Sequence, residues 1–180
     1  VEEVDQKELD LVFKTNIYGV LNIVHAVLPS MRKRKQGLII NISSIGSEIG
    51  LPFRGLYCAS KAAVDKITEG LRLEMRKFGV KVCSIQAGDI RTNINQNRLR
   101  PAEVSDVYKE DFERTYRIID EEVENGVEPE VFGPVVERIM RSKNPRRYYR
   151  VGKTLQKWAP TLKNLLPTGF FEMMLMKDYE

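Results

Sequence analysis

The stretch LIINISSIGSEIGLPFRGLYCASK, residues 38–61, organises the rest of the chain. Its first five residues, 38–42, are β-branched or apolar apart from one asparagine, and two serines follow them, which predicts a buried strand. A glycine-rich loop comes next and ends near Tyr57, where a helical pattern starts. Because Lys61 stands four residues after Tyr57, just over one helical turn, we expect both side chains on one face of the helix.

These positions suit proton transfer to or from a carbonyl or alcohol oxygen. A lone phenol holds its proton too tightly to act as a base at neutral pH, but an ammonium group at Lys61 stabilises the phenolate form of Tyr57. Ser44 follows the predicted strand, at the carboxyl end where open α/β sheets bind their ligands. We expect Ser44 to hold the substrate oxygen by a hydrogen bond. The alternative is an ordinary strand, loop and helix start with an incidental tyrosine–lysine pair.

The motif Asn41-Ile42-Ser43-Ser44, with Tyr57-x-x-x-Lys61 thirteen residues after Ser44, resembles the catalytic core of the classical short-chain dehydrogenase/reductases. Tyr-x-x-x-Lys alone occurs often by chance. The serine-to-tyrosine spacing, the preceding strand and the Ala-Ser-Lys-Ala-Ala context together make the resemblance specific. It implies an α/β fold with a Rossmann-like, doubly wound parallel sheet.

The resemblance also implies an activity. It is an NAD(P)-dependent oxidoreductase reaction that interconverts an alcohol and a ketone or aldehyde, with NADP favoured over NAD. In that reading Tyr57 gives or takes the proton, Lys61 also holds the nicotinamide ribose, and Ser44 and Tyr57 contact the substrate.

Asn16 lies inside an apolar helical pattern that spans residues 4–34, where asparagine is a poor helix former. The segment Asn16-Ile17-Tyr18-Gly19-Val20 resembles the N-x-x-G segment of the same family. The resemblance implies that Asn16 bends its helix and links the catalytic lysine to solvent through a water. The alternative is an asparagine that kinks the helix and has no catalytic part.

A second buried strand is predicted at residues 80–86, and Ala87-Gly88-Asp89-Ile90-Arg91-Thr92 follows at its carboxyl end. This segment resembles the family's Pro-Gly-x-[Val/Ile]-x-Thr turn, which implies that Gly88, Ile90 and Thr92 contact the nicotinamide together with Tyr57 and Lys61. Ala87 departs from the usual proline. Since proline would fix φ at this turn, its absence bears on how the cofactor is placed.

The glycine-rich turn that cradles the cofactor phosphates in this family is absent, as no G-x-G-x-x-G cluster occurs in the sequence. The resemblance therefore covers only the C-terminal half of the family's domain, with residues 1–152 as its catalytic half and 153–180 as a helical tail. We expect a longer natural polypeptide, three strands in the family order 5-6-7, and an open edge on the 38–42 strand. We also expect that this chain alone does not bind the nucleotide tightly.

The remaining segments complete the expected organisation. Helical patterns cover residues 57–78, 104–123 and 128–140, and a third short strand is expected at 146–152. In the family, the 4–34 and 57–78 helices pack against their copies in a partner, which implies a homodimer or homotetramer. The helix at 57–78 has its apolar side at Ala62, Ala63, Val64, Ile67, Leu71, Leu73 and Met75.

The tail, residues 153–180, alternates basic and bulky apolar side chains. It fits a lid on an apolar pocket, a subunit contact or a helix at a membrane surface, and the first two are favoured over the third. Ketoacyl-type reductases usually end soon after the last strand, so this tail looks more like the hydroxysteroid/retinol type. It favours a lipophilic substrate of steroid, retinoid or fatty-chain type. The alternatives are a broad-specificity carbonyl or 3-ketoacyl reductase, and a non-catalytic binding or regulatory subunit.

The composition restricts the classes of protein to which this chain can belong. The chain has 180 residues, 42% of them hydrophobic and 30% charged, which is typical of a globular domain. A net charge of +4 does not by itself argue for a nucleic-acid partner. Cys58 and Cys83 show no metal spacing and read as buried thiols of a reducing compartment, so we expect a cytoplasmic protein without a metal. No signal peptide opens the chain, and no apolar run approaches 18 residues.

Overall fold

The computed structural model describes residues 1–177 and 179, and its centre is a parallel sheet of three strands. The order is β1-β2-β3, with β1 at Gly37–Ser44, β2 at Val80–Ala87 and β3 at Tyr148–Val151. The register of β1 on β2 runs from Gly37 opposite Val80 to Ser44 opposite Ala87, so both strands end at the same edge. All three strands predicted from the sequence are present.

The helices also follow the expected order. The first helical run continues through a π-helical turn, and the insertion after β2 forms two helices of unequal length. The elements are α1 (Gln6–Phe13), η1 (Lys14–Tyr18), α2 (Gly19–Lys33), η2 (Ile45–Ser47), α3 (Gly55–Met75), η3 (Arg76–Phe78), α4 (Ile94–Asn97), α5 (Asp106–Glu124), η4 (Pro129–Val131), α6 (Phe132–Arg141), α7 (Thr154–Leu165) and α8 (Thr168–Met176).

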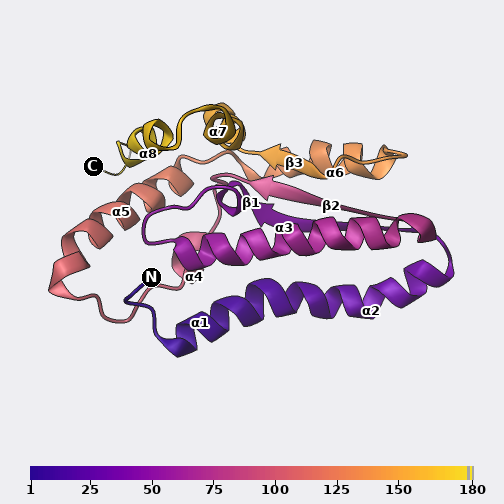
Figure 1. Cartoon of the computed structure of the whole chain (residues 1–180), viewed down its shortest axis with the longest axis horizontal. Helices are drawn as coiled ribbons and strands as arrows, with labels where there is room; N and C mark the ends of the chain where they lie inside the picture. The colour runs from indigo at the N-terminus through magenta and orange to yellow at the C-terminus, as the bar shows by residue number, and fades with distance from the viewer. Residues whose placement is uncertain (178, 180) are drawn as a thin grey trace.

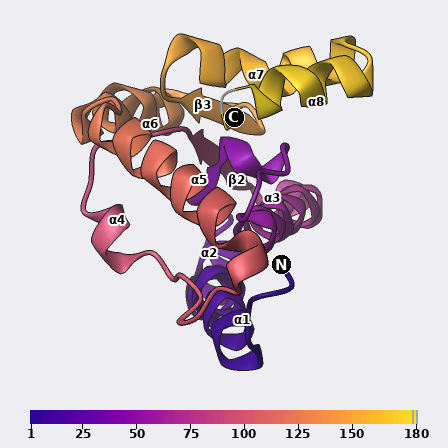
Figure 2. The same cartoon turned by 90° about the vertical axis from the view of Figure 1, so that its left-hand side faces the viewer.

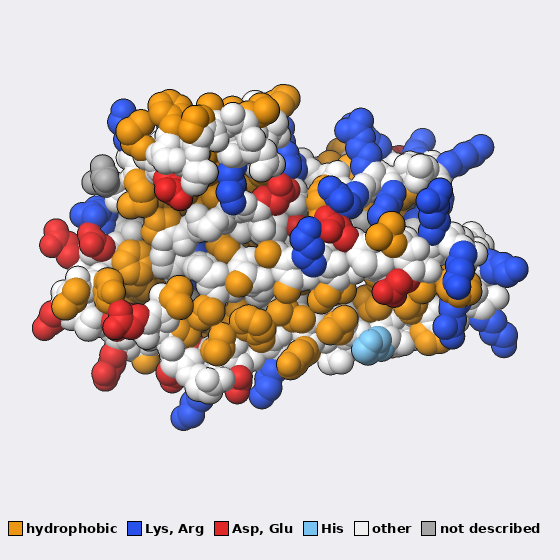
Figure 3. All heavy atoms as spheres, viewed as in Figure 1, with side chains coloured by type: hydrophobic (Ala, Val, Ile, Leu, Met, Phe, Trp, Pro, Cys, Tyr) orange, Lys and Arg blue, Asp and Glu red, His pale blue; other side chains and the backbone are white. Residues whose placement is uncertain are grey.

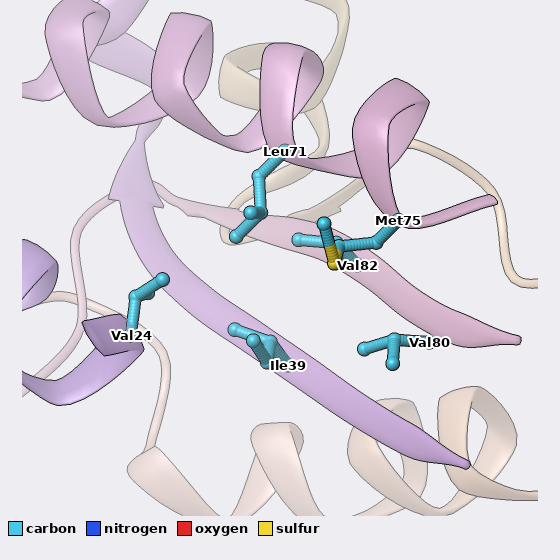
Figure 4. Close-up of a cluster of buried hydrophobic side chains, with 6 residues drawn as sticks. All are labelled: Val24, Ile39, Leu71, Met75, Val80 and Val82. Atoms are coloured by element: carbon cyan, nitrogen blue, oxygen red, sulfur yellow. The ribbon is translucent and has the colours of Figure 1, made fainter. Parts of the chain in front are cut away.

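Helices cover both faces of the sheet, as a doubly wound fold requires (Figures 1 and 2). Helices α2 and α3 pack on one face through a cluster of buried apolar side chains, and Figure 4 shows Val24, Ile39, Leu71, Met75, Val80 and Val82 from these helices and from β1 and β2. Helix α6 packs on the other face, where Ile139 contacts Cys83 and Ile85. The predicted α/β architecture is therefore confirmed for the part of the domain that this chain contains.

Helix α3 meets the sheet through buried polar contacts as well as apolar ones. The carboxylate of Asp65 is 4% exposed and accepts hydrogen bonds from Ser47 Oγ at 2.5 Å, Ser84 Oγ at 2.8 Å and Gln86 Nε2 at 2.8 Å. These donors come from the turn after β1 and from β2. Because hydrogen bonds are directional, they fix the position of α3 along the strands more closely than apolar packing would.

Two further hydrogen bonds join α3 to β1. Asn41 Nδ2 donates to Thr68 Oγ1 at 2.7 Å, and Ser43 Oγ donates to the backbone oxygen of Lys61 at 3.2 Å. Leu73 was expected on the apolar side of this helix, but its side chain is 73% exposed. The side of α3 that faces the sheet does not include Leu73. It includes the polar residues Asp65 and Thr68, which have hydrogen-bond partners on the strands.

The outer edge of β1 carries no strand within the described residues, as the sequence predicted. The side chain of Ile42 on this strand is 49% exposed. An open parallel edge presents unpaired backbone groups, so this edge suits the pairing of a further strand.

The first helical run lies within the range of residues 4–34 expected from the sequence, and it is apolar on average. Within residues 1–177 and 179, Gln6–Lys33 is the one helical stretch whose length and composition would allow it to cross a membrane. The sequence search missed it because asparagines and a histidine interrupt the apolar residues. Such a helix is weak evidence for a membrane span, and Val20, Val24 and Val27 pack one face of this one on the sheet.

Both cysteines are buried and unpaired, in agreement with the sequence expectation. Burial raises the pKa of the Cys83 thiol to about 11, although the nearby Arg72 guanidinium opposes the change. Burial likewise raises the pKa of the Cys58 thiol on α3. At neutral pH both side chains therefore remain uncharged thiols.

We expect the Asp65→Ala substitution to lower the free energy of unfolding by about 3 kcal/mol, because three buried donors lose a charged acceptor. Chemical denaturation measures the change as a shift of the midpoint at constant slope. The matched control is Lys66→Ala at the next position, which is exposed, and its effect should stay within about 0.5 kcal/mol. Equal shifts for the two variants would contradict the structural role given to Asp65.

Candidate active site

A cavity of about 550 Å³ lies at the carboxyl ends of β1 and β2. Ser44, Tyr57 and Lys61 line it, the first from the end of β1 and the other two from the beginning of α3. The other predicted cofactor contacts, Gly88, Ile90 and Thr92, line the same cavity. The structure thus brings together six of the seven site residues proposed from the sequence.

Ser44 is the last residue of β1, and its side chain is nearly buried. Its Oγ accepts a hydrogen bond from the backbone N–H of Gly46 at 3.1 Å, which caps the short helix η2. This contact holds the hydroxyl group at the cavity wall by its oxygen. The hydroxyl keeps its own proton to donate, and a carbonyl or alcohol oxygen in the cavity is a suitable acceptor.

Two cations flank the phenol ring of Tyr57. Lys61 Nζ lies 5.9 Å from the ring centroid and donates a hydrogen bond to the backbone oxygen of Ile42 at 3.2 Å. The guanidinium carbon of Arg54 lies 4.7 Å from the same centroid. The lysine was expected from its helical spacing. Arg54 was missed, because it stands in the loop before the helix, where periodicity carries no information on side-chain direction.

The loop that carries Arg54 has an unusual backbone. Phe53 adopts φ of 53°, the left-handed region that a bulky residue rarely occupies. Its ring makes edge contacts with Tyr108 and Phe112 of α5, with centroids 6.3 Å and 5.6 Å away. These contacts hold the loop in place, and so hold Arg54 against Tyr57.

Asn16 lies elsewhere, in the π-helical turn η1. It lines a second cavity of about 360 Å³, which also has Arg54 and Tyr57 in its wall. Asn16 Nδ2 donates to Ser60 Oγ at 3.0 Å, and Ser60 Oγ donates to the backbone oxygen of Tyr57 at 2.7 Å. The asparagine therefore contacts α3 through Ser60. A π-helical turn inside a long helix often marks a functional site.

Arg98 stands between the two cavities and lines both of them. Burial lowers the pKa of its guanidinium, and the positive charge of Arg54 acts in the same direction. Its Nη2 donates to Asn95 at 3.1 Å, while Nη1 is buried without a hydrogen-bond partner among the described residues. Sequence reasoning gave Arg98 no role, because a single arginine in a charged segment carries no motif.

Gln156 of α7 anchors the tail to the turn after β2. Its Oε1 accepts from the backbone N–H of Asp89 at 3.1 Å and from that of Lys153 at 3.3 Å, and its Nε2 donates to the Asp89 carboxylate. A β-carbon at Gly88 would collide with Gln156 Oε1. Gly88 therefore leaves room for the tail to dock, in addition to the cofactor contact predicted for it.

The tail also closes one side of the large cavity. Wall residues come from α7 and from α8, and most of them are apolar: Leu155, Gln156, Ala159, Leu162, Phe171, Met174 and Leu175. Figure 2 shows the two helices lying across the carboxyl end of the sheet. Together with the polar groups of β1, α3 and the turn after β2, they make a cavity with one polar side and one apolar side.

Known proteins share this arrangement. The sequence model of the short chain dehydrogenase family matches residues 1–103. The chain is 38% identical over 185 residues to a 3-ketodihydrosphingosine reductase of Bacteroides thetaiotaomicron, a match that covers 99% of this chain and 67% of the relative. The chain belongs to the short-chain dehydrogenase family.

Solved structures of short-chain dehydrogenases agree in fold. A short-chain dehydrogenase from Streptomyces avermitilis superposes with a TM-score of 0.74 at 24% identity, over 98% of this chain and 62% of that one. The protein ElxO, solved with NADP bound, matches 54% of this chain and 39% of its own, at 32% identity with a TM-score of 0.51. The matches to four of the curated relatives cover between about half and two thirds of the length of each relative.

Gly152, which directly follows β3, is a second glycine at the anchor of the tail. Its φ is 149°, and an added β-carbon would lie 3.0 Å from Gln156 Oε1 and 3.1 Å from Gly88 Cα. We expect Gly152→Ala to lower the free energy of unfolding by about 1–3 kcal/mol, because this backbone conformation strains any other residue.

The matched control for that measurement is Gly133→Ala at the start of α6, where no atom lies within 4 Å of the added carbon. There we expect a gain of about 0.4–1 kcal/mol. Thermal or chemical denaturation compares the two variants. A Gly152→Ala variant as stable as the parent protein would show that the corner between β3 and α7 is looser than the structure has it.

Proposed function

We propose that this chain is the catalytic half of an NAD(P)-dependent oxidoreductase that interconverts an alcohol and a ketone or aldehyde. The observation that carries the proposal is the convergence of Ser44, Tyr57 and Lys61 on one cavity in a chain of this family. The three groups are a hydroxyl donor, a proton-transferring phenol and a cation. Reduction of a carbonyl needs all three at the developing alkoxide.

The residues present fit the nicotinamide end of the cofactor. Gly88, Ile90 and Thr92 form one wall of the cavity beside Tyr57 and Lys61. When bound, the cofactor supplies or accepts the hydride. The NADP in the ElxO structure supports NADP as the cofactor here, with NAD as the alternative.

The chain's own side chains handle the proton. Ser44 donates a hydrogen bond to the substrate oxygen and orients it, and Tyr57 gives its proton to that oxygen or takes one from it. The positive charge of Lys61 stabilises the phenolate that remains after proton donation. Asn16 reaches the same helix through Ser60, which supports a role in returning the proton from solvent.

A lipophilic substrate fits the cavity, and we propose a steroid-like, retinoid-like or fatty-chain alcohol or ketone. One side of the cavity is formed by apolar residues of α7 and α8, such as Ala159, Leu162 and Phe171. The relative with 38% identity is named for a ketone of the sphingoid class. A fatty chain against the tail would place its carbonyl at the polar side, beside Ser44.

We further propose the division into residues 1–152, the catalytic half, and 153–180, the tail that covers it. The exposed apolar side chains of Leu11, Tyr18 and Ile23 on the first helical run support assembly into a homodimer or homotetramer. Two buried free thiols support a reducing, cytoplasmic environment.

Tyr57→Phe in the natural polypeptide should lower kcat for carbonyl reduction by about 10²–10⁴-fold, because the substrate oxygen loses its proton donor. Binding of NADPH, measured by nicotinamide fluorescence, should change little. The matched control is Tyr18→Phe, at an exposed phenol that lines neither cavity, with no expected change. If Tyr57→Phe retains most of the parent turnover, the assignment of Tyr57 is wrong, and a parent without turnover on any carbonyl would favour a binding subunit.

The present chain alone should bind NADPH only weakly, because its sequence contains no glycine-rich turn for the phosphates. Titration of the isolated 180-residue chain, followed by nicotinamide fluorescence, should give no saturation in the micromolar range. The natural polypeptide is the positive control. A micromolar dissociation constant for the isolated chain would mean that residues 1–180 hold the phosphates by other means.

A further inference from the structure

The outer surface of α7 and α8 is unusually apolar. Figure 3 shows hydrophobic side chains gathered over these two helices. The exposed residues are Leu155, Trp158 and Leu165 on α7 and Phe170, Met173, Met174 and Met176 on α8, with exposed fractions from 41% to 76%. Contiguous apolar surface of this kind marks a binding surface, since isolated exposed side chains would need no explanation.

Helix α8 is apolar on nearly every side. Six of the nine residues in its sequence TGFFEMMLM are large and apolar, yet only Phe171 is buried against the rest of the protein. A helix that is hydrophobic all round normally lies inside a protein or in lipid. Its outer side therefore requires a cover that the described residues do not supply.

The charges around this surface favour an anionic cover. Residues 153–171, which include all of α7, contain three lysines and no acidic residue: Lys153, Lys157 and Lys163. The last nine residues add one lysine and three acidic residues, so the positive charge is concentrated on α7. Lysine beside exposed leucine, phenylalanine and tryptophan is the pattern of a helix that lies in the headgroup region of a bilayer. A lysine near an anionic leaflet is attracted to it, and salt weakens the attraction.

The same surface borders the large cavity. Leu155 and Met174 line the cavity and are also exposed, with exposed fractions of 69% and 41%. The inward sides of the helices, at Ala159 and Phe171, form the cavity wall. Among the residues of α7 and α8 that line the cavity, Leu155 and Met174 are the apolar ones that also reach the outer surface.

We propose that α7 and α8 form a lid whose outer face docks on an anionic lipid bilayer, so that a lipophilic substrate passes from the lipid into the cavity beside Leu155 and Met174. From its sequence, this tail fits a lid, a subunit contact or a membrane helix. The structure assigns the lid to the inner side of the two helices and the membrane contact to the outer side. The passage of substrate rests on the proposed function, whereas the docking does not.

Trp158 gives a direct test, as it is the only tryptophan of the sequence and lies on the outer face. The probe is the natural polypeptide mixed with vesicles of phosphatidylcholine, either alone or with phosphatidylserine. The difference spectrum against a Trp158→Phe variant isolates the emission of Trp158. We expect a blue shift with the anionic vesicles that weakens as salt is added, and co-flotation of the protein with them.

The test variant is Trp158→Gln with Leu165→Gln, two exposed positions outside the cavity wall. We expect its partitioning onto anionic vesicles to fall at least about tenfold, equivalent to about 1.4 kcal/mol. The matched control is Val107→Gln with Met140→Gln, which removes two equally exposed apolar side chains from α5 and α6. The control should bind vesicles as the parent protein does.

Turnover separates docking from the proposed activity. The test variant should reduce a water-soluble ketone at the parent rate but a vesicle-borne long-chain ketone about tenfold more slowly, in line with the loss of partitioning. If neither protein reduces any ketone while vesicle binding behaves as expected, the proposed function fails and the docking stands. Equal vesicle binding by the test and control variants would overturn the docking. The docking would also be overturned if the parent protein does not bind vesicles but self-associates, and the test variant loses this self-association.

Discussion

The buried carboxylate of Asp65 is the contact on which the rest of this structure depends. It accepts hydrogen bonds from the turn after β1 and from two side chains of β2, while it is itself carried by α3. Apolar packing alone would let a helix slide along a sheet at little cost, but three directional bonds allow only one position. That position brings Tyr57 and Lys61 to the cavity in which Ser44 ends β1, so a polar contact one turn below the site determines its geometry.

Much of the fold was predictable because local sequence patterns determine its strands and helices. Runs of β-branched residues predicted β1 and β2, and helical spacing placed Tyr57 and Lys61 on one face of α3. Periodicity assigns apolar residues to the core and polar ones to solvent, so it predicted burial for Leu73 and could not identify Asp65 or Thr68 as buried. Their partners lie on strands that no local pattern connects to the helix.

The site shows the same division. Its motif residues were recognisable from spacing, whereas Arg54, Arg98 and Gln156 act through contacts that only the folded chain creates. Gln156 is 67 residues from Asp89 in sequence, and no local sequence pattern at either position predicts their hydrogen bond. The π-helical turn around Asn16 was likewise invisible beyond the asparagine itself, because the sequence shows a poor helix former without showing how the backbone absorbs it.

The crowded corner at Gly88, Gly152 and Gln156 has a practical consequence for laboratory evolution. A library meant to change substrate preference would naturally randomise the cavity wall, and Gly88 is part of that wall. A side chain at Gly88 would displace the end of the Gln156 side chain and so disturb its hydrogen bonds to the turn after β2, and one at Gly152 would meet the backbone of Gly88. Diversity is better directed to Ala159 and Leu162, where side chains of other sizes would reshape the cavity while the contacts of Gln156 with the turn after β2 stay intact.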